Sequence, residues 1–184
     1  MLYFVRHALD DESFVGSWSD VSILDSEKDK VKEVAQKIKP LSITNIVSSD
    51  ITRARETAEI IAQELGLPIR LDPNLREQNK GDLTGKRRSL LTEEERILIE
   101  QQQIDTKFPN GETLIDVYER IKKYLEEIKD FEDGTLIVTH RGVINMIYYA
   151  LTNTPLDMDK KRFDVGHLSV HEYDVKKSLI RRIQ

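Results

Sequence analysis

The sequence contains no cysteine, which excludes disulfide bonds, thiolate nucleophiles and cysteine-ligated metals. It also has no apolar run near the roughly 18 or more residues that a membrane-spanning helix needs. The apolar run at residues 1–5 ends at Arg6 and is too short for the hydrophobic part of a signal peptide. We therefore expect a cytoplasmic protein that does not associate with membranes.

An excess of positive charge is also missing, because 28 lysines and arginines face 33 aspartates and glutamates, a formal charge of −5. This balance argues against a nucleic-acid surface that neutralises phosphates and against a polybasic membrane anchor. The chain is instead 39% hydrophobic and 33% charged, as in folded soluble proteins. Its 184 residues contain no repeat, low-complexity tract or linker, so we expect one domain over residues 1–184.

Short apolar runs alternate with helical patterns in the first half of the chain. Buried strands are predicted at residues 2–5, 43–47, 69–71 and 136–138. Between them, apolar stripes predict one helix from Ser26 to Pro40 and another that is capped by Ser48-Ser49-Asp50 and ends at Gly66. This alternation predicts an α/β fold with a largely parallel sheet.

The second half predicts three more helices and a hairpin. A capping box at Thr92 and Glu95 predicts a polar helix over about residues 92–104. The clearest helical stripe consists of Leu114, Val117, Tyr118, Ile121, Tyr124, Leu125 and Ile128. An apolar helix follows at 143–151, and alternating residues at 168–175 and 179–183 predict a terminal antiparallel hairpin.

Polar side chains occur where the predicted strands end. Arg6 and His7 close the first strand, Arg53 lies in the first turn of the helix after the second, Glu77 follows the third, and His140 closes the fourth. The carboxyl ends of parallel strands meet at one edge of a sheet, so these side chains are expected to lie together. Arginine forks and helix N-termini both bind tetrahedral oxyanions, and the pattern therefore predicts a phosphate pocket.

Simpler interpretations exist for each of these residues. Both histidines could be hydrogen-bonded core residues, and Glu77 could be a carboxylate on a surface loop. Arg53 could form a helix-surface ion pair with Glu56 or Glu59, worth under about 1 kcal/mol. We favour the pocket because the residues occupy equivalent strand–helix junctions.

These segments resemble motifs of the histidine phosphatase superfamily, the phosphoglycerate-mutase-like group. The similar segments are residues 2–7, 48–58, 75–85 and 138–144, in the order of the family. The resemblance extends over nearly the whole chain. It implies a three-layer α/β/α fold with a mostly parallel central sheet and a C-terminal antiparallel hairpin, with a small cap segment around residues 82–112.

The resemblance also implies a role for each residue of the predicted pocket. His7 would be the nucleophile, Arg6, Arg53 and His140 would hold the phosphoryl oxygens, and Glu77 would protonate the leaving oxygen. A nucleophilic imidazole must be neutral, and Glu77 can act as an acid only if its pKa is raised. Since the guanidinium groups supply positive charge, we expect no metal ion and no other cofactor.

The chain departs from the family pattern at positions that affect substrate preference. Ala8 follows the nucleophile, where the family usually has glycine, and Arg141 follows the second histidine, again in place of glycine. Ser13 stands where an asparagine often binds phosphate.

We assign Ser13 and Arg141 to substrate binding, although Ser13 is short and Arg141 could project to solvent. Arg6, Arg53 and Arg141 against Glu77 would give the pocket a net charge of +2.

Other residues allow further interpretations. His167 and His171 lie four residues apart on a predicted strand, as in some metal sites, but a third ligand is lacking. His167 could instead make a modest substrate contact. Lys86-Arg87-Arg88 is most simply a solvated run, with anion binding as the alternative. Phe14 and Trp18 could stack on a substrate, and we expect at least one of them to be buried.

The short segment between Glu77 and His140, residues 78–139, favours an open pocket that water can enter. We therefore predict a phosphatase that hydrolyses small phosphomonoesters and binds a small phosphorylated metabolite as its substrate. We expect it to be a monomer or a homodimer. The alternatives are a phosphoglycerate mutase and a non-catalytic phospho-ligand binding or regulatory protein. A metal-dependent hydrolase ranks third.

Overall fold

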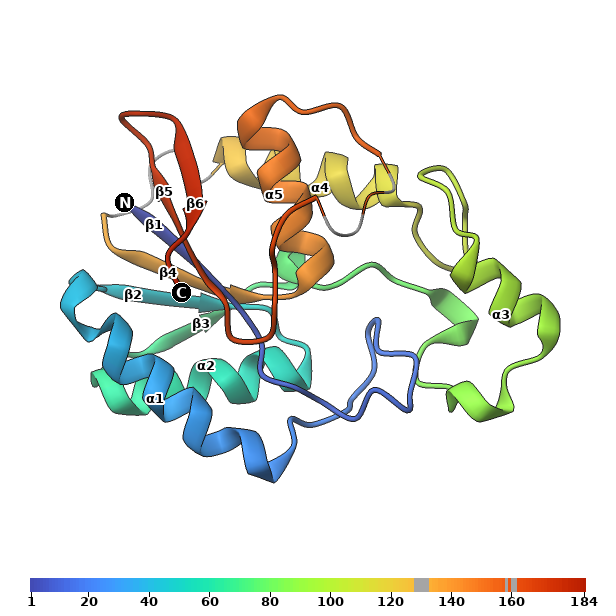
Figure 1. The fold of residues 1–184 in the computed structure, drawn as a ribbon, viewed down its shortest axis with the longest axis horizontal. Coiled ribbons are helices and arrows are strands. Elements are labelled where there is room, and N and C mark those ends of the chain that lie inside the picture. The colour runs from blue at the N-terminus through green and yellow to red at the C-terminus, as the bar shows by residue number, and fades with distance from the viewer. Residues whose placement is uncertain (128–132, 158, 160–161) are drawn as a thin grey trace.

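The computed structural model describes residues 1–127, 133–157, 159 and 162–184 (Figure 1). Its centre is a six-stranded sheet in the order β3-β2-β4-β1-β5-β6. The strands are β1 (Leu2–Arg6), β2 (Asn45–Ser48), β3 (Ile69–Leu71), β4 (Thr135–Thr139), β5 (Val170–Asp174) and β6 (Leu179–Arg182). The first four run parallel, whereas β5 pairs antiparallel with both β1 and β6.

Helices cover both faces of this sheet. The helices are α1 (Lys28–Ile38), α2 (Thr52–Leu65), α3 (Glu93–Glu100), α4 (Leu114–Glu127) and α5 (Arg141–Thr152). Leu2 and Phe4 of β1 pack with α4 and α5, while the alternate residues Tyr3 and Val5 pack with α1 and α2. The three-layer α/β/α fold with its C-terminal hairpin is therefore confirmed.

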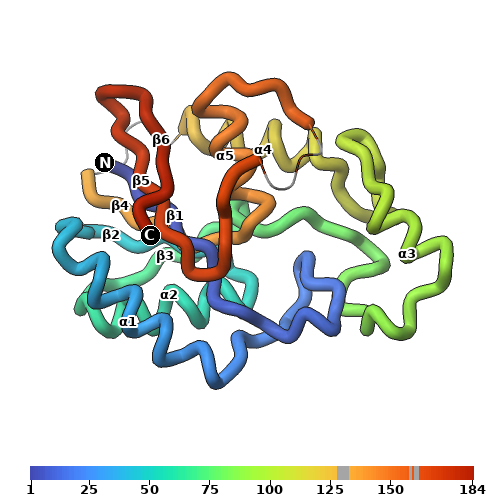
Figure 2. The backbone as a smooth tube through the Cα atoms, viewed as in Figure 1, coloured from blue at the N-terminus to red at the C-terminus, as the bar shows by residue number. Residues whose placement is uncertain are grey.

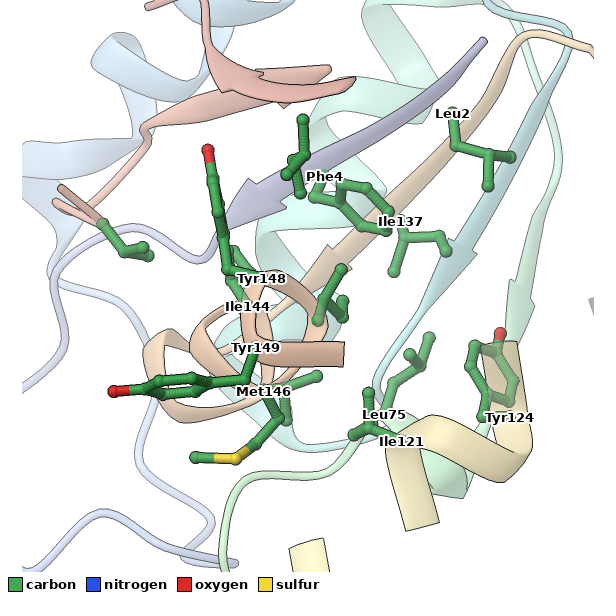
Figure 3. Close-up of a cluster of buried hydrophobic side chains, with 14 of the residues drawn as sticks. Leu2, Phe4, Leu75, Ile121, Tyr124, Ile137, Ile144, Met146, Tyr148 and Tyr149 are labelled. Atoms are coloured by element: carbon green, nitrogen blue, oxygen red, sulfur yellow. The ribbon is translucent and has the colours of Figure 1, made fainter. Parts of the chain in front are cut away.

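One of the two main cores lies between the sheet and helices α4 and α5 (Figure 3). Phe4, Ile137 and Ile144 are completely buried there. Burying side chains of this size stabilises a fold by about 1.5–3 kcal/mol each. The same packing fixes the position of the first turn of α5, which follows directly from β4.

One predicted helix start is wrong. Helix α2 has Ile51 as its N-cap residue, without a side-chain cap, rather than a residue of Ser48-Ser49-Asp50. Asp50 pairs with Arg76, and Ser49 Oγ contacts His140 and accepts only from the N–H of Ile51, the N-cap residue itself, at 3.3 Å. Tertiary partners have replaced the local cap.

The helices of the second half also differ in length from their predictions. Helix α3 keeps the predicted capping box of Thr92 and Glu95 but ends at Glu100, short of residue 104. Helix α4 follows the predicted stripe as far as Glu127, and Ile128 lies outside the described residues. No helix within the described ranges is both long and apolar enough to cross a membrane.

Residues 82–112 lie to one side of the sheet, next to the loop after β1 (Figure 2). A separate small core of Val15, Leu83, Leu91 and Phe108 joins this segment to that loop. Gly81 permits the turn, because it has φ +53° and an added Cβ would lie 1.8 Å from the carbonyl oxygen of Pro109. The arrangement forms one side of the cavity described next.

Candidate active site

A cavity of about 490 Å³ lies at the carboxyl ends of β1 and β4. Arg6, His7, Arg53 and Glu77 line it, and the ring of His140 lies 5.1 Å from that of His7. The structure therefore brings the five predicted catalytic residues together, although they come from four separate segments of the chain.

His7 is held as a neutral imidazole with an unprotonated Nε2. Its Nδ1 lies 2.7 Å from the carbonyl oxygen of Ala8, and a carbonyl can only accept, so Nδ1 carries the proton. Arg53 Nε donates to Nε2 at 3.3 Å. Burial, followed by the charges of Arg53 and Arg6, holds the pKa of His7 well below its ordinary value of 6.5. Nε2 therefore carries no proton, and in this structure its lone pair accepts the long hydrogen bond from Arg53.

Arg53 is buried beneath the cavity. Its Nη2 donates to the carbonyl oxygen of Ser17 at 2.8 Å, and its Nε lies 3.5 Å from a carboxylate oxygen of Asp10. Its Nη1 is buried and has no hydrogen-bond partner among the described residues. Burial lowers the pKa of Arg53, but a guanidinium remains charged at physiological pH.

Arg6 is held from the loop before β5. Its Nη1 donates to the carbonyl oxygen of Val165 at 3.1 Å, and its Nη2 lies 2.6 Å from His167 Nε2. Since a guanidinium only donates, His167 Nε2 must accept. Burial, with the charge of Arg6, lowers the pKa of His167 to about 4, so its ring is neutral. The Nε of Arg6 has no partner in the described ranges.

His140 adds a third buried nitrogen that has no hydrogen-bond partner among the described residues. It is completely buried between β4 and α5, and its Nε2 lies 2.9 Å from Ser49 Oγ. If Ser49 donates to Nε2, the ring proton is on Nδ1, which is buried and unpartnered within the described chain. Arg6 Nε and Arg53 Nη1 in the cavity lining, and with this tautomer also His140 Nδ1 next to His7, therefore lack an acceptor in the described part of the chain. An unsatisfied buried donor costs about 1–3 kcal/mol, which an anion with several oxygens would offset.

Glu77 is fixed by backbone amides. Its Oε1 accepts from Gln78 N at 3.0 Å and its Oε2 accepts from Gly142 N at 3.1 Å. Trp18 Nε1 donates to the Glu77 carbonyl at 2.7 Å, which holds the main chain as well. The carboxylate therefore has a fixed place at the N-terminus of α5, beside the cavity.

The two residues assigned to substrate binding differ in position. Arg141 lines the cavity, and its charge contributes to lowering the pKa of Arg6 to about 10, after burial. Ser13 is exposed and is not among the lining residues, because its N–H and hydroxyl bond to Asp11 instead. The structure thus places Ser13 away from the site. Ala8 is also outside the lining, with its N–H donating to Thr57 Oγ1.

The basic run and the two aromatic residues of the neighbouring loops mostly contact other protein groups. Lys86 pairs with Glu95, and Arg87 stacks on Phe14 at 4.6 Å. Only Arg88 of the run borders the cavity, where its Nε donates to the Glu12 carbonyl. Phe14 and Trp18 are both half-buried, so the expected burial of one of them is wrong.

The expected net charge of +2 does not hold for the cavity as a whole. Its charged lining residues are Arg6, Arg53, Lys80, Arg88 and Arg141 against Asp10, Glu12, Glu77, Asp157 and Asp159, so the formal charges cancel. Positive charge is concentrated near His7, where Arg6 and Arg53 lie. Apart from Glu77, the sequence did not reveal the acidic members, because they belong to loops.

Three side chains could in principle hold a metal ion. Ligand atoms of His7, Asp10 and His167 lie within 4.8 Å of one another. Arg53 contacts the first two and Arg6 contacts the third, so a divalent cation would face two guanidinium groups. The predicted alternative of a His167–His171 site is not formed, because the ring nitrogens of His171 bond to Tyr148 and Ser169.

Several contributing residues were missed in the sequence. Asp10, Ser17 and Ser49 act on the arginine and histidine side chains through contacts between distant loops, for which no local pattern exists. Asn145 and Tyr149 line the cavity and could have been found, because they follow Arg141 at the four-residue spacing of one helix face.

Known proteins resemble this chain over nearly its whole length. The family model of the histidine phosphatase superfamily (branch 1) matches residues 2–184. A curated relative, the probable phosphoglycerate mutase GpmB of Escherichia coli (strain K12 / DH10B), is 32% identical over 186 residues, covering 97% of this chain and 86% of that protein.

Solved structures share the fold. Bacillus stearothermophilus YhfR aligns with a TM-score of 0.82 at 26% identity, over 99% of this chain and 94% of that one. A mycobacterial glucosyl-3-phosphoglycerate phosphatase gives a TM-score of 0.76 at 21% identity, over 99% and 96% of the two chains. A putative alpha-ribazole-5'-P phosphatase from Escherichia coli gives 0.80 at 17% identity, over 98% and 93%.

Proposed function

The chain belongs to the histidine phosphatase superfamily, and from this premise we propose that it is a phosphatase that hydrolyses small phosphomonoesters without a metal ion. The observation that carries the proposal is the set of three unpartnered nitrogens, Arg6 Nε, Arg53 Nη1 and His140 Nδ1, beside the neutral His7. A phosphoryl group would satisfy all three with its oxygens.

In the first step, His7 Nε2 attacks the phosphorus atom of the bound ester. The phosphorus–nitrogen bond forms while the bond to the leaving oxygen breaks, and Glu77 gives that oxygen a proton. Arg6 and Arg53 stabilise the charge on the remaining phosphoryl oxygens. The hydrogen bond from His7 Nδ1 to the Ala8 carbonyl keeps the ring oriented and stabilises the positive charge that it acquires.

In the second step, water attacks the phosphohistidine. Glu77, now a carboxylate, takes a proton from that water, the phosphorus–nitrogen bond breaks, and inorganic phosphate leaves. The cavity supports hydrolysis because its volume of about 490 Å³ leaves room for water beside a small product.

A phosphoglycerate mutase is the second candidate, supported by the relative that is 32% identical. A mutase transfers the phosphoryl group back to a bound phosphoglycerate, so its 3-phosphoglycerate conversion depends on bisphosphoglycerate. A phosphatase releases phosphate from its substrate irrespective of that compound. Assays of 3-phosphoglycerate with and without bisphosphoglycerate separate the two functions.

The test of catalysis itself is turnover of p-nitrophenyl phosphate in the presence of a chelator. We expect turnover by the wild type and none by His7→Ala. Wild-type protein that binds inorganic phosphate but hydrolyses nothing would instead be a phospho-ligand binding protein. Activity that the chelator abolishes would identify a metal-dependent hydrolase.

A further inference from the structure

Helix α5 presents a line of polar side chains to the cavity. Arg141, Asn145 and Tyr149 follow one another at four-residue intervals, and all three line the cavity. A helix rises by about 1.5 Å per residue, so their backbone positions span about 12 Å. The line begins beside Gly142, which binds Glu77, and continues away from it.

Asn145 is the unusual member of this line. Its side chain is only 8% exposed, and its Oδ1 has no hydrogen-bond partner within the described ranges. Buried amides in folded proteins almost always have partners, because an unpaired one is unfavourable. Since Asn145 lines the cavity, the missing partner would come from whatever the cavity binds.

At the far end of the line, next to Tyr149, the carboxylate of Asp157 is held in place by hydrogen bonds. Tyr149 Oη donates to Asp157 Oδ1 at 2.6 Å, and that oxygen also accepts from the backbone N–H of Asp159. Arg162 pairs with the other carboxylate oxygen of Asp157. Arg162 therefore already balances the charge of Asp157. A ligand that contacts Asp157 is better a neutral hydroxyl than another cation.

From these contacts, and resting on the proposed function, we infer that the leaving group of the substrate is a hydroxyl-rich, sugar-like body that lies along α5 and gives a hydroxyl to Asn145. A hydroxyl both donates and accepts, so it satisfies the amide in either orientation of its oxygen and nitrogen. The cavity of about 490 Å³ is also large for a three-carbon acid alone.

The experiment compares kcat/KM for three kinds of phosphomonoester. The first is the best of a panel of hexose and pentose phosphates, the second is cyclohexylmethyl phosphate, which has a ring without hydroxyls, and the third is p-nitrophenyl phosphate. We expect the wild type to prefer the sugar phosphate to the cyclohexyl ester by about tenfold or more. Asn145→Ala and Asn145→Leu should lose that preference, with less than about a twofold change on the other two esters.

Matched controls separate binding from folding. Ser19 has another buried, unpartnered hydroxyl in the described chain but does not line the cavity, so Ser19→Ala should keep the sugar preference. Asn145→Leu removes an unpaired buried amide, so its Tm should equal or exceed that of the wild type.

The results distinguish this inference from the proposed function. If the wild type hydrolyses p-nitrophenyl phosphate but shows no preference for sugar phosphates, the inference is overturned while the phosphatase stands. An equal loss on all three esters in the Asn145 variants also overturns it. If the wild type hydrolyses none of them, the proposed function fails, and the inference fails with it.

Discussion

The carboxylate of Glu77 occupies the space that a side chain at Gly142 would fill. An added Cβ at Gly142 would lie 2.2 Å from Glu77 Oε1, while the backbone N–H of Gly142 donates to Oε2 at 3.1 Å. One glycine therefore supplies both the room and the hydrogen bond for the proposed acid. A larger residue at position 142 would therefore displace that carboxylate.

The first prediction concerns that glycine. Gly142→Ala should lower kcat for p-nitrophenyl phosphate on the order of 100-fold, because the methyl group displaces the general acid. The fold should be retained, since the three nearest atoms that the methyl group would meet all belong to the Glu77 side chain; the Tm of the variant checks this. Gly166→Ala is the matched control, because an added Cβ there meets nothing within 4 Å. Unchanged kcat in Gly142→Ala would remove Glu77 from the mechanism.

The second prediction concerns the ionisation of His7. Its lowered pKa means that the ring stays neutral, with the proton on Nδ1, as the pH falls through the ordinary value of 6.5. Imidazole ¹⁵N NMR spectra of the free protein, assigned with His7→Ala, should show that tautomer on both sides of this pH. An imidazolium signal from His7 near neutral pH would contradict the account.

The third prediction tests how Arg6 is positioned. His167→Phe removes the acceptor of Arg6 Nη2, and loss of a hydrogen bond to a charged group costs about 1.5–3 kcal/mol. We expect kcat/KM to fall by about ten- to 100-fold and inorganic phosphate to inhibit more weakly. His167→Gln retains an acceptor and should recover most of both values. Equal losses in the two variants would mean that the His167 contact does not position Arg6.

The fourth prediction concerns pH-dependent stability. Burial lowers the pKa of His171 to about 4, from 6.5. Below pH 6.5 the unfolded chain takes up a proton that the folded chain does not, so the free energy of unfolding decreases as the pH falls toward 4.

For one such group the loss between about pH 7 and about pH 5 is about 2 kcal/mol. Urea unfolding at these two pH values should show the wild type losing about this much more than His171→Gln. The same decrease in both proteins would show that His171 does not titrate as described.

The sequence predicted those parts of the site that depend on local pattern and topology. Apolar runs placed β1 and β4, and parallel strands necessarily bring Arg6, His7 and His140 to one edge. The first turn of α2 and the segment after β3 added Arg53 and Glu77 by the same rule.

What the sequence did not reveal depends on loops that meet in space. Ser13 stands where the family often has asparagine, but it bonds to Asp11 and is not part of the cavity lining. Ser49 has good capping chemistry, yet the contact with His140 determines its place. Asp157 reaches the cavity from a segment without any periodic pattern. Such tertiary contacts override local preference.

The most direct test of the account is the detection of phosphohistidine on His7. Wild-type protein mixed with a reactive phosphomonoester and quenched at alkaline pH should carry one acid-labile phosphoryl group, located on the peptide that contains His7 by mass spectrometry. Glu77→Gln should accumulate more of it if Glu77 also assists hydrolysis, and His7→Ala should carry none. Turnover by the wild type without any phosphoryl-enzyme, or with full activity retained in His7→Ala, would contradict the account.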